Sequence, residues 1–160
     1  GGRLTQPDIR TLVELIAYEK LNIEYKARST PAEAPGKYSC STLTQAVFAN
    51  VGIHLPRYAI DQSYIGTLLE EPCEGSLVFY KNRFPITDSD RSIGHVGILT
   101  TNKTIIHGSS KSRKIVEQTF DKKPIMIRDV IPNYSCMLLI LPEQQEGVET
   151  ALDLLRFAQR

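Results

Sequence analysis

The chain has 160 residues, of which 41% are hydrophobic, and this is enough apolar surface for one well-packed core but not for two. Its 19 basic and 18 acidic residues leave a formal charge of +1 without a long run of either sign, which argues against a nucleic-acid-binding protein. The longest apolar run, Met137–Leu141, is far shorter than the roughly 20 residues that cross a bilayer, so no membrane span is expected.

The first half of the chain has the spacing and turn residues of helices joined by loops. Apolar side chains recur at helical spacing, and proline, glycine and hydroxyl residues mark the breaks. The predicted elements are a helix over Pro7–Lys20, a loop over Arg28–Lys37, a helix over Ser41–Asn50 and a short helical piece over Gln62–Leu69. The second helix therefore begins directly after Cys40.

The second half is dominated by short runs with strand composition. The predicted strands are Ser76–Tyr80, His95–Thr100, Thr104–His107, Lys114–Gln118, Pro124–Asp129 and Ser135–Leu141. An amphipathic helix over Glu143–Arg160, about 143–158 in its regular part, is expected to close the chain. Helices followed by strands predict an α+β fold in a single domain over residues 1–160, with a core from about 12 to 141.

Cys40 is the first candidate for chemistry, because it lies where a loop meets a helix N-terminus. Unpaired backbone N–H groups and the helix dipole favour a thiolate there, as a nucleophile requires. The alternative from position alone is a small buried residue at a helix start. Cys73 and Cys136 lack a Cys-x-x-Cys spacing, so they indicate either two buried thiols or, in an exported protein, one disulfide.

A thiol nucleophile needs a base, and the chain offers His54, His95 and His107. His54 follows Gly52 in a loop and is interpreted as a surface histidine. If Thr101–Lys103 forms a three-residue hairpin loop, Gly97 lies opposite His107, and His95 becomes its diagonal neighbour on the same face. A two-residue loop would place the two histidines on opposite faces, where they would be unrelated.

Five short motifs, in this order, resemble those of NlpC-type cell-wall peptidases. They are Tyr38–Leu43 (similar to Asp-Cys-Ser-Gly-Leu), Gly52–Arg57 (Gly-Ile-x-Leu-Pro-Arg), Glu74–Tyr80 (Pro-Gly-Asp-Leu-Val-Phe-Phe), Gly94–Ile98 (Ser-His-Val-Gly-Ile) and Ile105–Ser109 (Phe-Ile-His-Ala-Ser). The resemblance implies a papain-like core, with the nucleophile at a helix N-terminus packed on a small antiparallel sheet.

The same resemblance implies the roles of individual residues. Cys40 is the expected nucleophile, His95 the base and His107 the residue that orients the base. Six further positions are expected at the substrate cleft: Tyr25, Tyr38, Ser39, Ser41, Arg57 and Gly94. The implied reaction is hydrolysis of a D-glutamyl–diamino acid bond in peptidoglycan stem peptides, without a cofactor or metal, by a monomer.

The chain departs from the family pattern directly before the nucleophile. Ser39 replaces an acidic residue that is associated with binding a free amine of the substrate, and Thr42 replaces a glycine. Two alternatives therefore stay open. One is a cysteine amidase or acyltransferase on another substrate, and the other is an inactive binding module, including one in which Cys40, His95 and His107 hold zinc.

The expected location is the cell envelope or the exterior, and a cytoplasmic location stays open. Gly1 and Gly2 resemble the scar of a cleaved tag, so a native export signal can have preceded the chain.

Overall fold

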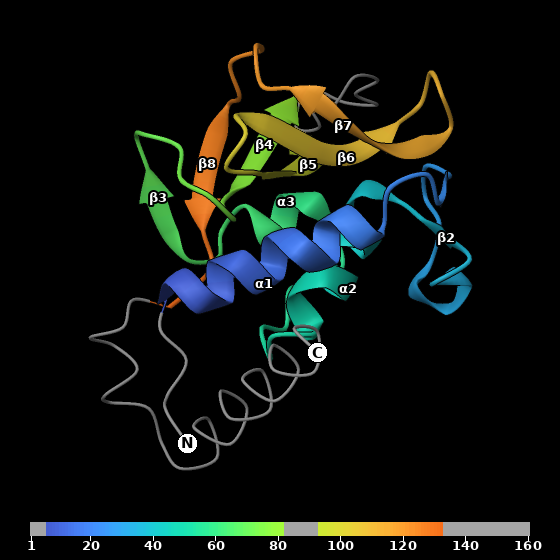
Figure 1. Cartoon of the computed structure of the whole chain (residues 1–160). Helices are drawn as coiled ribbons and strands as arrows, with labels where there is room; N and C mark the ends of the chain where they lie inside the picture. Colours follow the sequence, from blue (N-terminus) through green and yellow to red (C-terminus); the bar gives the residue numbers. More distant parts are fainter. Residues whose placement is uncertain (1–5, 82–92, 133–160) are drawn as a thin grey trace.

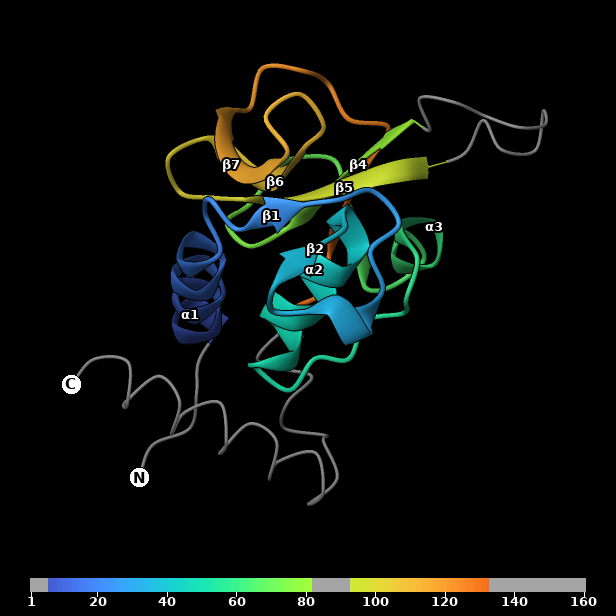
Figure 2. The same cartoon turned by 90° about the vertical axis from the view of Figure 1, so that its right-hand side faces the viewer.

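The computed structural model describes residues 6–81 and 93–132, and these form a mixed α+β fold built around one curled sheet. In the described part, helices α1 (Gln6–Glu19), α2 (Cys40–Ala49) and α3 (Ala59–Gln62) lie on the same side of the sheet (Figures 1 and 2). The helices predicted over Pro7–Lys20 and Ser41–Asn50 are confirmed. None of the described helices is long and apolar enough to cross a membrane.

The sheet has eight strands in the order β2-β1-β7-β6-β5-β4-β8-β3. Their bounds are β1 (Glu24–Tyr25), β2 (Lys37–Tyr38), β3 (Thr67–Leu69), β4 (Leu77–Lys81), β5 (Ile93–Leu99), β6 (Thr104–Ser109), β7 (Lys114–Thr119) and β8 (Met126–Asp129). All pairs are antiparallel except β1 with β2. The sheet is thus larger than the small antiparallel one expected, because Glu24–Tyr25, Lys37–Tyr38 and Thr67–Leu69 also form strands. The predicted loop over Arg28–Lys37 holds a 3-10 helix (Pro31–Glu33) and ends in β2.

The prediction of a helical piece over Gln62–Leu69 is wrong. Helix α3 ends at Gln62, and Thr67–Leu69 instead pairs with β8. Gly66 has φ +81, and its Cα lies so close to the backbone of Asp129 that a side chain would collide with it. Edge pairing with β8 therefore overrides the helical spacing. The strand predicted over Ser135–Leu141 and the helix over Glu143–Arg160 lie outside the described residues, so the single-domain assignment stays a prediction.

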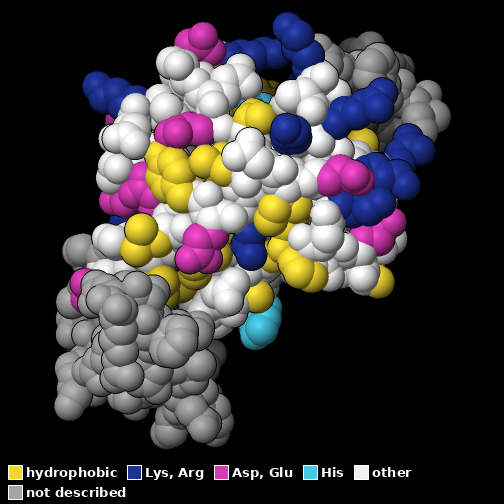
Figure 3. All heavy atoms as spheres, turned by 45° about the vertical axis from the view of Figure 1, so that its right-hand side comes forward, with side chains coloured by type: hydrophobic (Ala, Val, Ile, Leu, Met, Phe, Trp, Pro, Cys, Tyr) yellow, Lys and Arg dark blue, Asp and Glu magenta, His cyan; other side chains and the backbone are white. Residues whose placement is uncertain are grey.

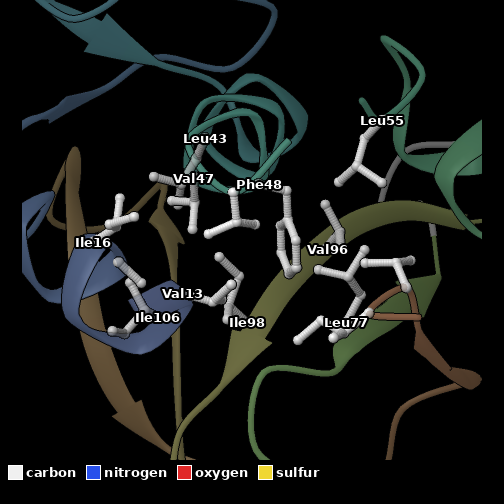
Figure 4. Packing of buried hydrophobic residues seen from close by; sticks show 14 of the residues in the cluster. Val13, Ile16, Leu43, Val47, Phe48, Leu55, Leu77, Val96, Ile98 and Ile106 are labelled. Atoms are coloured by element: carbon white, nitrogen blue, oxygen red, sulfur yellow. The ribbon is translucent and has the colours of Figure 1, made fainter. Parts of the chain in front are cut away.

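The main core lies between the helices and one face of the sheet. Val13 and Ile16 from α1 and Leu43, Val47 and Phe48 from α2 pack on strand residues (Figure 4). The strand residues in this contact are Leu77, Val96, Ile98 and Ile106. Because successive strand residues point to opposite faces, a second small cluster lies on the other face. This packing holds α2 and β5 in fixed relative positions.

The turn that joins β5 to β6 is held by α1. Thr100 N donates to the carbonyl oxygen of Thr104 at 2.9 Å, so the loop has the three residues Thr101–Lys103, and Lys103 has φ 57. The Glu14 carboxylate accepts hydrogen bonds from the backbone N–H and the hydroxyl of Thr101, both at 2.8 Å. The predicted loop length is therefore confirmed, and α1 stabilises it.

Glu74 lies beside Glu14, and this pair makes stability depend on pH. The hydrogen bond with Glu14, then burial and the charge of Glu14, raise the pKa of Glu74 to about 7. Because a glutamate has an ordinary pKa near 4.5, the folded chain binds more protons than the unfolded chain between these values. The free energy of unfolding should therefore fall as the pH rises through this window.

We expect Glu74→Gln to raise the melting temperature at pH 8 and to leave it nearly unchanged at pH 5. Glutamine keeps a donor for Glu14 without the charge that is costly at high pH. Thermal unfolding followed by circular dichroism at both pH values measures this, with the exposed Glu71→Gln as the matched control. Equal melting temperatures for Glu74→Gln and the parent chain at pH 8 would contradict the raised pKa.

Candidate active site

Cys40 is the first residue of α2, and its neighbours form the cap of that helix. Ser39 is the N-cap residue, with φ −87 and ψ 177. The backbone N–H of Thr42 donates to Ser39 Oγ at 3.2 Å, and the N–H of Ser39 donates to Thr42 Oγ1 at 2.8 Å. This reciprocal pair is a capping box in which Thr42 takes the place of the usual glutamate. Thr42 therefore has a structural role at the position where the family pattern has glycine.

The Cys40 sulfur lies against the edge of β5. Its distance to the carbonyl oxygen of Gly94 is 3.9 Å, and the backbone N–H of Val96 also interacts with it. These two backbone groups flank His95. Strands β5 and β6 pair only at Ile98 with Ile106 and at Leu99 with Ile105. The start of α2 thus meets β5 beyond the paired part of these strands.

Burial raises the pKa of the Cys40 thiol above its ordinary value. Backbone N–H groups of Val96 and Ser41 and the charge of Arg57 act in the opposite direction, but burial has the larger effect. The expectation of a resting thiolate, based on the helix N-terminus alone, is therefore not met. The thiol keeps its proton until a base removes it.

His95 and His107 are in direct contact. His95 Nε2 and His107 Nδ1 are 2.7 Å apart, and the rings meet edge to face with centroids 5.0 Å apart. Continuing the β5–β6 register by one step places Gly97 opposite His107, and a Cβ on Gly97 would lie 3.2 Å from His107 Cβ. The predicted diagonal arrangement of the two histidines is confirmed, since Gly97 leaves the space in which the rings meet.

Gln118 on β7 contacts the other ring nitrogen of His107, and the sequence did not lead us to expect it. Its Oε1 lies 2.9 Å from His107 Nε2. Gln118 is a diagonal neighbour of His107, because His107 pairs with Val116. The count that related His95 to His107, applied to the turn after Ser109, would have identified Gln118 from the sequence.

The contacts of Gln118 and His107 define the protonation of the histidine pair. An amide oxygen only accepts hydrogen bonds, so His107 Nε2 carries the proton. Burial lowers the pKa of His107, opposed by the hydrogen bond to Gln118, and keeps its ring neutral. His107 Nδ1 is therefore an acceptor, and His95 Nε2 donates to it. In neutral His95 the lone pair consequently resides on Nδ1.

Of the six residues expected at the substrate cleft, three are almost fully buried. Tyr38, Ser39 and Ser41 are 1%, 4% and 5% exposed, and the two serine hydroxyls bond within the protein. Arg57 donates to Ser41 Oγ at 2.9 Å and to the carbonyl of Ser29 at 2.7 Å, and Gly94 is exposed beside Cys40. Their role in binding substrate stays a prediction.

Tyr25 is the member of that set that packs against β6. Its ring packs on Gly108, directly after His107, so closely that a Cβ on Gly108 would overlap it. Burial and the negative charge of ionised Cys40 raise the pKa of Tyr25, and a hydrogen bond to Ser110 opposes them. Tyr25 therefore lies within electrostatic range of the cysteine.

Within residues 6–81 and 93–132, no group of three or more His, Cys, Asp or Glu side chains is arranged to hold a metal ion. The 2.7 Å contact between His95 and His107 is a hydrogen bond, whereas two imidazole nitrogens on one zinc ion stand farther apart, each about 2.0–2.1 Å from the metal. Zinc binding by Cys40, His95 and His107 would therefore require the two rings to move apart. His54 is exposed, as expected, and Cys73 is a half-buried free thiol.

The model of the NlpC/P60 family matches residues 24–131 of the chain. Among solved structures, NlpC1 from Trichomonas vaginalis is 26% identical, with a TM-score of 0.64 over 81% of this chain and 45% of that chain. NlpC2 from the same organism is 25% identical, with a TM-score of 0.63 over 81% of this chain and 48% of that chain.

The chain thus spans about half the length of these two Trichomonas proteins. The NlpC/p60 domain of the peptidoglycan hydrolase SagA shares the fold at 18% identity, with a TM-score of 0.61 over 75% of this chain and 97% of that chain. No curated protein matches the chain.

Proposed function

Since the chain belongs to the NlpC/P60 family, we propose that it is a cysteine peptidase that hydrolyses an amide bond in peptidoglycan stem peptides. The observation that carries this proposal is the position of the Cys40 sulfur, against the two backbone groups that flank His95. His95 is in turn hydrogen-bonded to His107. In this proposal Cys40 is the nucleophile, His95 is the base and His107 orients the base.

The proposed reaction begins with transfer of the Cys40 proton to His95 Nδ1, as the sulfur attacks the carbonyl carbon of the scissile amide. The resulting oxyanion faces backbone N–H groups at the start of α2, where the helix dipole stabilises negative charge. His95 then returns the proton to the leaving amine, and the C–N bond breaks. Water, deprotonated by His95, hydrolyses the thioester and releases the acid and the thiol.

The raised pKa of Cys40 suits this mechanism. Because burial raises the pKa of the Cys40 thiol, the proposed proton transfer to His95 is coupled to the attack of the sulfur on the substrate carbonyl. His107 stays neutral and accepts from His95 Nε2, so it stabilises the imidazolium that forms on His95. No cofactor takes part in these steps.

The bond that we propose lies between D-glutamate and a diamino acid, and the cell envelope or the exterior is the proposed location. The family match and the peptidoglycan hydrolase SagA among the proteins of the same fold support this substrate class. We propose a monomer as the active form.

A second candidate is a cysteine amidase or acyltransferase on another substrate. It is favoured by one observation: Ser39, next to the nucleophile, is neutral and uses its hydroxyl in the helix cap. Incubation of the chain with purified peptidoglycan and free stem peptides, followed by mass spectrometry of the new termini, separates the candidates. New amino termini on the diamino acid support the peptidase, and intact stem peptides together with rapid alkylation of Cys40 favour the second candidate.

Gln118 enters this mechanism as the residue that sets the protonation of the histidine pair. We expect Gln118→Glu to move the acidic limb of the pH profile of kcat/KM to higher pH. A carboxylate next to His107 Nε2 stabilises the protonated pair, so the base becomes available only at higher pH. Measuring initial rates with one stem peptide between pH 5 and 9 tests this.

Gln118→Leu removes the acceptor and should lower kcat about tenfold at every pH, because His107 can then adopt the tautomer that disables His95. Thr119→Val, an exposed change on the same strand, is the matched control. An unchanged pH profile in Gln118→Glu would show that Gln118 does not act on the histidines.

A further inference from the structure

A pocket of about 620 Å³ lies between the chain after β1 and the turn that joins β6 to β7. Tyr25 and Lys26 form one side, and Ser110, Arg113 and Lys114 form the other. Its volume is in the range of sites that hold a residue-sized ligand. Nothing in the proposed mechanism uses this pocket.

The walls of the pocket are held by strand hydrogen bonds. Tyr25 N donates to the carbonyl of Arg113 at 2.9 Å, and Glu24 pairs with Lys114. The turn after β6 is closed by the N–H of Arg113, which donates to the carbonyl of Ser109 at 2.8 Å. The two sides therefore keep a fixed separation, which a binding site requires.

The charge of the pocket is positive. Lys26, Arg113 and Lys114 line it, against one carboxylate, that of Glu24. Glu24 is itself 3.3 Å from Lys37 in an ion pair. Figure 3 shows Lys and Arg side chains gathered on this side of the molecule. A concave surface with an excess of cations attracts anions.

Glu33 is the other carboxylate close to this surface. It accepts a hydrogen bond from the backbone N–H of Thr30 at 2.8 Å and thereby caps the 3-10 helix. This hydrogen bond and, more weakly, the charges of Lys26 and Lys37 lower the pKa of Glu33. If Lys37 and Glu33, which lie beside the pocket, are counted with the lining residues, four cations still face two carboxylates, and the surroundings of the pocket stay positive.

Tyr25 connects the pocket to the nucleophile. Its ring lines the pocket and also packs on Gly108, next to His107. The charge of ionised Cys40 acts on its hydroxyl. Tyr25 is therefore the side chain that both lines the pocket and lies within electrostatic range of Cys40.

We infer that this pocket is a substrate subsite for an anionic group, which in a peptide substrate is a carboxylate. The inference rests on the proposed function, because it places the subsite along the path of the substrate. Lys26, Arg113 and Lys114 attract the carboxylate, and the Ser110 and Ser112 hydroxyls donate to it. Ser39, on the nucleophile side, adds no opposing charge. A substrate with a carboxylate at this end binds more tightly than one with a neutral group or an amine.

The test measures binding to the Cys40→Ser chain, so that it does not depend on turnover. One stem tripeptide is prepared with a free amine, an acetyl or a succinyl group at its amino end, which gives charges of +1, 0 and −1 at one position. A second set compares a free carboxyl terminus with its amide. Dissociation constants are measured by calorimetry at low and high salt. We expect the carboxylate form to bind about tenfold more tightly in one of the two sets, and less so at high salt.

Two double variants decide whether the pocket is responsible. Arg113→Gln with Lys114→Gln should abolish the preference for the carboxylate, whereas Lys122→Gln with Lys123→Gln, which removes the same charge from another pocket, should preserve it. Equal loss in both variants, or equal binding of all peptides, overturns the inference.

Hydrolysis of the peptides by the parent chain is measured alongside. Hydrolysis without any carboxylate preference refutes the subsite alone, and the preference without hydrolysis refutes the proposed peptidase alone. Absence of both refutes both.

Discussion

Replacement of Cys40 by alanine should lower kcat/KM for a stem peptide by about 10⁴-fold or more, to the limit of detection. The alanine methyl group cannot form an acyl-enzyme, so the histidine pair would have no nucleophile to activate. The measurement is release of the amine product from one stem peptide, followed by mass spectrometry at equal protein concentrations. Circular dichroism verifies that the variant is folded.

Cys73→Ala is the matched control for this experiment. Cys73 is a half-buried free thiol whose sulfur lies 3.5 Å from Arg10 Nη1. It is not among the hydrogen-bonded side chains of His95, His107 and Gln118. We expect this variant to keep the activity of the parent chain. Activity that survives in Cys40→Ala would refute the proposed nucleophile, and loss of activity in Cys73→Ala alone would transfer that role to Cys73.

Replacement of His95 by alanine should lower kcat by about 10³-fold, within the range by which general acid–base catalysis contributes. Burial raises the pKa of Cys40, so the thiol depends on a base for ionisation near neutral pH. In His95→Ala, alkylation of Cys40 by iodoacetamide should therefore shift to higher pH than in the parent chain. The rate of alkylation between pH 6 and 10 is read from intact mass.

His54→Ala is the matched control for the base, because His54 is the exposed histidine of the described chain and should be dispensable. The hydrolysis rate and the pH dependence of alkylation are both measured, because a misfolded variant would lose hydrolysis without reporting on the base. If His95→Ala alkylates like the parent chain at every pH, His95 does not act on Cys40, whatever happens to hydrolysis.

The relation between the two histidines could be predicted because it depends on counting. A three-residue loop after Thr100 determines the register of β5 and β6, and Gly97 provides the space between the rings. The same is true of Cys40, since hydroxyl residues around a loop–helix junction indicate a helix start. Local rules were sufficient at these places.

Other features depend on contacts that are distant in sequence. The strand Thr67–Leu69 forms only because β8 lies next to it, so helical spacing was misleading there. The raised pKa of Cys40 arises from packing against β5, which the helix N-terminus does not reveal. The buried side chain of Gln62 forms hydrogen bonds with Thr44, Ser41 and Pro56. These contacts stabilise α2, and local helix or strand propensity does not predict them.

The contact between the Val96 amide and the Cys40 sulfur has a spectroscopic consequence. An amide proton that faces sulfur experiences a different field when the thiol becomes a thiolate, and again when the sulfur is acylated. The nitrogen–proton resonance of Val96 is therefore a built-in indicator of the state of the cysteine. Its chemical shift reports ionisation and acyl-enzyme formation in the unmodified chain, without a dye and without a substitution.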